Sequence, residues 1–204
     1  MTMLRALFVA ALLASAISGC QTGYTLNLPN DYESRSRMAF EFEEDKDRPF
    51  KAIVDVLDLA DQPAGARPTM IREMQRSIEK LHEPLTFTVL VATPDGVLEC
   101  PPFGLKPATA AMKKTAQDWL TQLPVGPRAD AASAMKLALH YEPDLMYLLS
   151  ADFKRFIPPT VAESLESSNP NLRINVIQFV SDSNADYVES FAKQWCGRAR
   201  IGVK

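Results

Sequence analysis

Four aspartates and one arginine are the side chains best placed to bind a ligand in this 204-residue chain. Asp58, Asp61 and Asp152 follow predicted strands, whereas Arg128 and Asp130 come just before a predicted helix. Carboxylate oxygens are the hard ligands that magnesium and calcium prefer, and calcium tolerates the looser geometry of the two. Arg128 brings a positive charge towards the same site. These five residues form the candidate ligand-binding crevice.

The elements that would position these residues alternate between strands and helices. Apolar runs and alternation predict strands at 52–57, 85–91, 97–100, 145–149, 174–179 and 199–203. Helical spacing of apolar residues predicts helices over 70–81, 108–123, 130–140 and 187–195, and the capping-box pattern from Thr160 to Glu163 predicts a short helix. The fold is therefore expected to be α/β, with a mostly parallel central sheet, one antiparallel edge strand, and helices on both faces.

This arrangement explains why distant residues would meet. In an open α/β sheet, ligands bind in the crevice beyond the carboxyl ends of the strands. Asp58 follows the first predicted strand, and Asp152 follows the apolar strand at 145–149. We expect both to project from that edge of the sheet.

Several local sequences resemble the von Willebrand factor A (VWA) family, and together they cover roughly residues 50–204. Val56-Leu57-Asp58 resembles the end of the first strand, where an Asp opens the family's D-x-S-x-S metal motif. The segment 126–130 resembles the G-G-T-D loop, and 143–150 resembles the P-D-x-I-x-L-L-S run. The resemblance implies a VWA/Rossmann-like three-layer sandwich with a metal-ion-dependent adhesion site.

The chain departs from the family at most of the implied metal ligands. Ala60 and Gln62 stand in place of the motif serines, and Ala129 stands in place of a threonine. Ala151 occupies the usual Asp position, with Asp152 one residue later. We therefore expect a degenerate site that holds no metal or other cofactor. The alternative is a rearranged magnesium or calcium site, with the ligands Asp58, Asp61, Asp130 and Asp152.

Asp55 falls inside the first predicted strand, where a sheet covered on both faces should be apolar. An unpaired carboxylate in such a place is costly. Either the strand is irregular there, or Asp55 pairs with a base such as Arg173.

The first twenty residues have the pattern of a bacterial lipoprotein signal. The positive charge of Arg5 precedes an apolar run over 6–17, which is too short for a helix that crosses about 30 Å of hydrocarbon. Ile17-Ser18-Gly19-Cys20 resembles the lipobox of these signals. The resemblance implies cleavage before Cys20, a diacylglyceryl group on its sulfur, and acylation of the new N-terminus.

These features give three expected regions: a signal peptide at 1–19, a lipidated Cys20 with a tether at 20–49, and a VWA-like domain at 50–204. The lipid would anchor the protein to a membrane outside the cytoplasm. The lipoprotein resemblance implies that Gln21, a residue other than Asp after the cysteine, favours the periplasmic side of the outer membrane in a Gram-negative cell. Cys100 and Cys196 are expected to be free thiols, because the VWA topology places them at opposite edges of the sheet and a bridge needs Cα atoms within about 7 Å.

The composition argues against nucleic-acid binding and gives little support for catalysis. The net charge is −3, and no stripe of basic residues with interleaved aromatics is present. There are two histidines and no G-x-S-x-G, H-E-x-x-H, P-loop or G-x-G-x-x-G motif. We expect a metal-independent protein-binding or scaffolding module, not an enzyme, whose partner is an unidentified envelope protein. A metal-dependent adhesion module is the alternative, and an envelope hydrolase is the least favoured.

Overall fold

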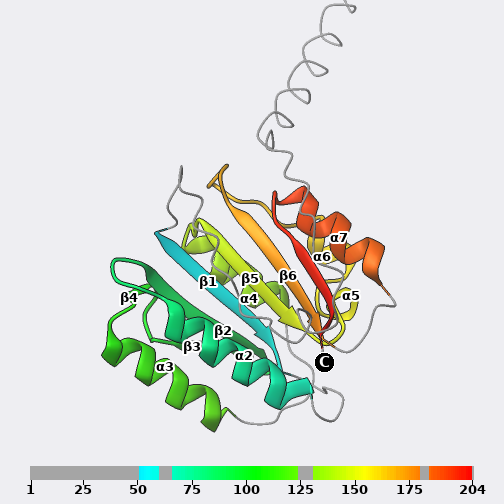
Figure 1. Ribbon diagram of the computed structural model, residues 1–204. Helices are drawn as coiled ribbons and strands as arrows, with labels where there is room; N and C mark the ends of the chain where they lie inside the picture. Colours follow the sequence, from blue (N-terminus) through cyan, green and yellow to red (C-terminus); the bar gives the residue numbers. More distant parts are fainter. Residues whose placement is uncertain (1–50, 60–65, 124–130, 180–183, 204) are drawn as a thin grey trace, which may run out of the picture. The chain divides into compact units, whose positions relative to one another are not determined.

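Seven strands form one sheet in the computed structural model, which describes residues 51–59, 66–123, 131–179 and 184–203 (Figure 1). The strand order is β3-β2-β1-β5-β6-β7, and β4 also pairs with β2. The strands β1, β2, β5, β6 and β7 run parallel, whereas β3 and β4 run antiparallel to β2. Their bounds are β1 Ala52–Asp58, β2 Thr86–Thr93, β3 Gly96–Cys100, β4 Lys106–Pro107, β5 Leu145–Ser150, β6 Arg173–Phe179 and β7 Ala199–Val203.

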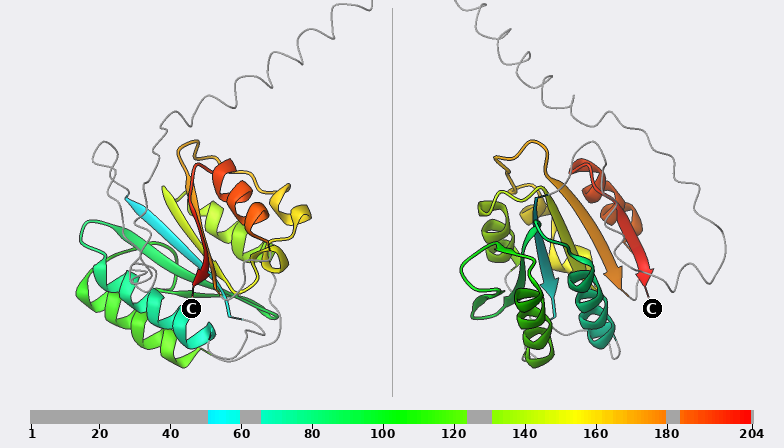
Figure 2. Two further views of the ribbon diagram at one scale, coloured as in Figure 1. Left: turned by 45° about the vertical axis from the view of Figure 1, so that its right-hand side comes forward. Right: turned by 60° about the vertical axis from the view of Figure 1, so that its left-hand side comes forward.

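Helices lie on both faces of the sheet, as predicted (Figures 1 and 2). One face is packed by α2 (Ala66–Lys80) and α3 (Ala110–Gln122). The other is packed by α4 (Ala131–His140), α5 (Phe153–Phe156), α6 (Pro159–Ala162) and α7 (Ala185–Gln194). Within the described residues, no helix is both long enough and apolar enough to cross a membrane.

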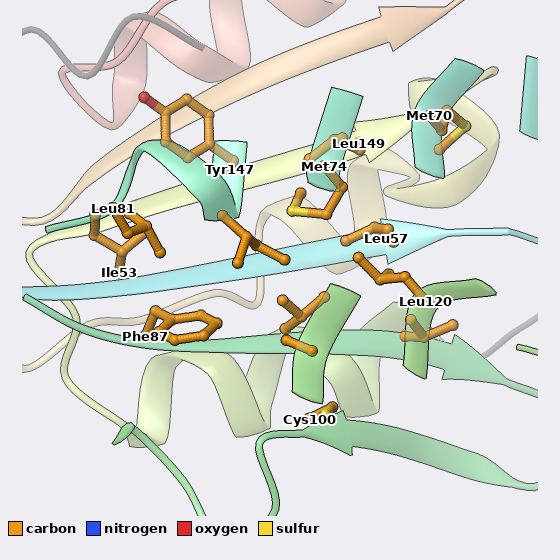
Figure 3. Close-up of a cluster of buried hydrophobic side chains, with 14 of the residues drawn as sticks. Ile53, Leu57, Met70, Met74, Leu81, Phe87, Cys100, Leu120, Tyr147 and Leu149 are labelled. Carbon is orange, nitrogen blue, oxygen red and sulfur yellow. The ribbon is translucent and has the colours of Figure 1, made fainter. Parts of the chain in front are cut away.

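The burial of the strands explains why the sheet could be predicted. All six residues of β5 are buried, as expected for a central parallel strand that is covered on both sides. Along β1, alternate side chains belong to opposite layers. Ile53 and Leu57 pack with Met70 and Met74 of α2 (Figure 3), whereas Val54 and Val56 pack with α4.

Two short elements differ from the expectation. The sheet has a second antiparallel strand, β4, because the chain pairs with β2 again after β3. The helix α6 begins at Pro159 and not through a capping box at Thr160, and its N-cap Pro158 makes no side-chain cap hydrogen bond. Proline favours the first helical position because its fixed φ suits the helix and its missing N–H would have no helical partner there.

The cysteine expectation is correct for one residue and wrong for the other. Cys100 is a buried free thiol on β3, and Cys196 precedes β7 at the opposite edge of the sheet, so the two do not bridge each other. Cys196 is nevertheless disulfide-bonded. The sheet topology separates Cys196 from Cys100 only, so it does not require Cys196 to be a free thiol.

Candidate functional site

Asp58 and Asp152, two of the five predicted crevice residues, lie together at the carboxyl edge of the sheet. β1 ends at Asp58 and its parallel neighbour β5 ends at Ser150. The Ser150 Oγ donates a hydrogen bond to Asp58 Oδ2 at 2.8 Å and accepts one from the Asp152 backbone N–H at 3.1 Å. Ser150 is fully buried, so it fixes the carboxylate of β1 against the loop that follows β5.

Asp152 also has a structural role in this loop. Its Oδ1 accepts a hydrogen bond from the Arg155 backbone N–H at 3.2 Å, which caps α5, and lies 3.5 Å from the Asn184 Nδ2. The next backbone N–H, of Phe153, donates to Oε1 of the buried Gln178 at 3.0 Å. Side chains from the ends of β5 and β6 and the start of α7 therefore hold the edge in place.

Ser150, Gln178 and Asn184 belong to this site but were not among the predicted crevice residues. A polar residue at the end of an otherwise apolar strand was the available signal for Ser150 and Gln178. Asp61, Arg128 and Asp130 lie outside the described residues, so their place in the crevice stays a prediction.

The described part of this edge offers hydrogen-bond acceptors and negative charge. In the described ranges, no group of three or more His, Cys, Asp or Glu side chains is arranged to hold a metal ion. Both histidines lie at the opposite edge, because His82 precedes the start of β2 and His140 precedes the start of β5. Neither imidazole can act as a general base at the crevice, since a general base must come within hydrogen-bonding reach of its proton.

Asp55 lies outside this site. Neither of the two expected arrangements, an irregular strand or a pair with Arg173, is found. The strand is regular, since Asp55 pairs in continuous register with Val89 on one side and Tyr147 on the other. No ion pair joins it to Arg173. That arginine pairs in register with Leu145 at the start of β5, whereas Asp55 pairs with Tyr147. The side chain is 1% exposed, and its Oδ1 has no hydrogen-bond partner. Burial raises the pKa of Asp55 to about 8, so the group is mainly protonated at neutral pH.

No protein-family model matches the chain, and no curated protein matches its sequence. Solved structures do match its fold. The von Willebrand factor type A protein from Catenulispora acidiphila has a TM-score of 0.63 and 17% identity, over 74% of this chain and 38% of that chain. The pilus adhesin SpaC from Lactobacillus rhamnosus GG, in its open conformation, has a TM-score of 0.55 and 7% identity, over 74% and 28%. The ArnB paralog VWA2 from Sulfolobus acidocaldarius has a TM-score of 0.51 and 13% identity, over 76% and 41%.

These similarities define the class of fold. The chain has a VWA-like fold, with a mostly parallel sheet between helical layers. It spans less than half the length of each of the three solved chains named above.

Proposed function

We propose that the protein is a lipid-anchored lipoprotein of the cell envelope whose VWA-like domain binds a partner protein without a metal ion. The observation that carries the proposal is the edge at Asp58 and Asp152, where Ser150 joins the Asp58 carboxylate to the Asp152 backbone by part-buried hydrogen bonds. This edge is the place where open α/β sheets bind ligands. A pilus adhesin is among the solved proteins with this fold, which supports a binding role. Function does not follow from fold alone, so the site must be tested directly.

Metal independence rests on how the carboxylates are used. Asp58 Oδ2 accepts the Ser150 hydroxyl and Asp152 Oδ1 caps α5, so an oxygen of each already serves the protein. Ala151 supplies no ligand where the VWA resemblance implies an Asp. A metal-dependent adhesion module is the second candidate, because Asp58 and Asp152 are close enough to share Ser150. That candidate needs further ligands from Asp61 and Asp130.

The first prediction places the partner at this edge. A cell that makes the Lys154→p-benzoylphenylalanine variant should give a discrete photo-crosslinked adduct, because Lys154 is exposed and lies on α5 directly beside the capped loop. The matched control is Lys114→p-benzoylphenylalanine, at an exposed lysine on α3. The measurement is the mass of the adducts on an immunoblot. Equal adducts from both positions, or none from Lys154, would show that the partner does not bind here.

The second prediction concerns metals. After chelation, magnesium, calcium or manganese should leave the melting temperature of the mature protein unchanged. A cation at about 100 times its Kd would add about 2.7 kcal/mol, which corresponds to a rise of roughly 5–10 °C in a protein of this size. Calorimetry of the wild type and of Asp58→Ala checks this. A rise that occurs in the wild type and is lost in the variant would replace this proposal with the metal-dependent module.

A further inference from the structure

The outer edge of β3 offers backbone groups that no strand of the described chain pairs with. β3 lies at one end of the strand order and pairs there only with β2. The turn at 94–95 has two residues, so the residues beside it close the hairpin as a hydrogen-bonded pair. Hydrogen-bonded pairs recur at every second residue, so Leu98 and Cys100 also bond β2. The N–H and C=O groups of Val97 and Glu99 therefore point away from the sheet.

This edge lacks the features with which proteins usually protect the edges of their sheets, namely edge charges, prolines and bulges. β3 pairs with β2 in continuous register over its five residues, so the strand contains no bulge. Its one charged side chain, Glu99, lies on the α4 side and accepts a hydrogen bond from the Tyr141 hydroxyl at 2.7 Å. At the opposite edge, by contrast, a register shift at Gln178 and Phe179 interrupts the pairing of β6 with β7. β3 is therefore open to another strand.

The loop between β3 and β4 limits the length of a strand that can pair with this edge. Pairing with β2 stops at Cys100 and resumes at Lys106, and only Thr88 lies between their partners on β2. Residues 101–105 thus stand opposite a single residue, so they protrude beyond the edge. A strand placed beside β3 meets this loop after five residues, which is the length of β3 itself.

The same loop holds an aromatic side chain in solvent. Phe103 is 89% exposed, and its φ of 65° lies in the left-handed region that is unfavourable for residues other than glycine. Glu99 Oε1 accepts hydrogen bonds from the Gly104 N–H at 3.0 Å and from the Tyr141 hydroxyl, and these bonds fix the loop. Strained backbone and aromatic anchors are both typical of binding surfaces. Phe103 therefore marks this edge as an interface.

The free backbone groups favour a polypeptide over a lipid surface as the occupant of this edge. Open sheet edges do not occur in hydrocarbon, because their N–H and C=O groups would lose their hydrogen bonds to water. A further strand satisfies these groups directly. β3 of a second copy has the length that the loop allows.

Two β3 strands are also complementary to each other. When Leu98 lies opposite Leu98 in an antiparallel pair, Val97 of each copy lies opposite Glu99 of the other. Their outward N–H and C=O groups then exchange hydrogen bonds in both directions. The two leucine side chains, each 37% exposed, meet at the two-fold axis and bury each other. A register with Glu99 opposite Glu99 is disfavoured, because like charges directly opposite destabilise a strand pair.

We propose that the protein forms a two-fold symmetric dimer in which β3 of one copy pairs antiparallel with β3 of the other. The two sheets thereby become one continuous sheet. In this register the exposed turn at 94–95 of each copy lies beside the loop of the other, so Phe103 packs on Pro94 of the second copy. The same surface is used by both copies, so the assembly closes at two.

Disulfide trapping tests the register. In a non-hydrogen-bonded antiparallel pair the Cα atoms lie about 4.5 Å apart, which is within the range of a disulfide bond. Mild oxidation of the purified mature protein with Leu98→Cys should therefore give a covalent dimer on a non-reducing gel. The matched control is Asp118→Cys, at an exposed position on α3, which should stay monomeric.

A charge exchange tests the same contact without a new covalent bond. Leu98→Lys and Leu98→Glu should each sediment as monomers at concentrations where the wild type is dimeric, because each places like charges at the axis. An equal mixture of the two variants should restore the dimer. Misfolding of either variant could not produce this recovery.

Two further variants separate the backbone pairing from the aromatic anchor. Val97→Pro removes an outward N–H, which an edge strand tolerates, and should weaken the dimer at least about tenfold. Val97→Thr keeps this N–H and should sediment like the wild type. Phe103→Ser should also weaken the dimer, whereas Phe103→Leu should retain most of its affinity.

A wild type that stays monomeric over the whole concentration series, with no excess of covalent dimer from Leu98→Cys over the control, would overturn the dimer. A Leu98→Cys adduct with a different protein in cells would assign the edge to that protein instead. Binding of monomeric protein to phosphatidylglycerol vesicles that Phe103→Ser abolishes would assign the loop to a lipid surface. The edge of β3 is separate from the crevice at Asp58 and Asp152, so failure of the dimer leaves the proposed function standing.

Discussion

Replacing Asp55 with asparagine is expected to stabilise the protein by about 2–4 kcal/mol at pH 7. In the unfolded chain the Asp pKa is near 3.9, whereas burial raises the pKa of Asp55 to about 8 in the folded protein. At pH 7 the unfolded state therefore releases a proton that the folded state keeps, which favours unfolding by about 4 kcal/mol. The asparagine side chain cannot ionise, so the substitution removes this term. Its buried amide offsets part of the gain, because it needs hydrogen-bond partners of its own.

The sign of the pH dependence of the unfolding free energy distinguishes a protonated Asp55 from an ionised Asp55 that has a partner. A group with a raised folded pKa contributes its full stability below the unfolded pKa, and this contribution is lost as pH rises towards the folded pKa. The wild type should lose about 1.4 kcal/mol per pH unit between roughly pH 4 and pH 8 through Asp55, and Asp55→Asn should lack this part of the slope. Tyr147, the neighbour on β5, stays protonated throughout this range because its pKa is raised to about 12.

Thermal melts of both proteins from pH 4 to pH 8 check the result. At pH 7 the variant should melt roughly 5–15 °C above the wild type, and the difference should vanish near pH 4. Asp118→Asn is the matched control, because the Asp118 carboxylate is exposed on α3 and pairs with Lys114 one helical turn away. A variant that is less stable than the wild type at pH 8 would mean that Asp55 is ionised and has a partner in the folded state.

Strands and helices that are long enough to show a pattern of buried apolar residues could be predicted from the sequence. The apolar run of β5 and the helically spaced apolar residues of α2 indicate which side chains are buried, and the structure confirms both. β4 and α5 could not be predicted in this way, because two or four residues are too few to show a period.

The candidate site was predictable only in part, for a similar reason. Asp58 and Asp152 could be placed at one edge, because parallel strands end on the same side of a sheet. The hydrogen bond between Ser150 and Asp58 joins residues 92 positions apart, so it depends on the register between β1 and β5. Asp55 was recognised as costly, yet its protonated state depends on the fully packed environment around it.

Replacing Cys20 with alanine is expected to abolish palmitate labelling and tight membrane association of the protein. A single acyl chain binds a membrane only marginally, whereas several chains on one residue anchor it stably, at about 0.8 kcal/mol per buried CH₂. The measurement is metabolic palmitate labelling together with an alkaline wash of the membranes. Cys196→Ser is the matched control and should keep both the label and the membrane association.

The chemistry of the Cys20 sulfur gives this prediction a second readout. A sulfur that carries diacylglycerol is a thioether, and disulfide formation needs a thiolate. A lipidated Cys20 therefore resists alkylation both before and after reduction. An intact mass with acyl chains at residue 20 supports the lipoprotein. A mature chain without acyl mass, in which Cys20 can be alkylated after reduction, would contradict the lipid anchor.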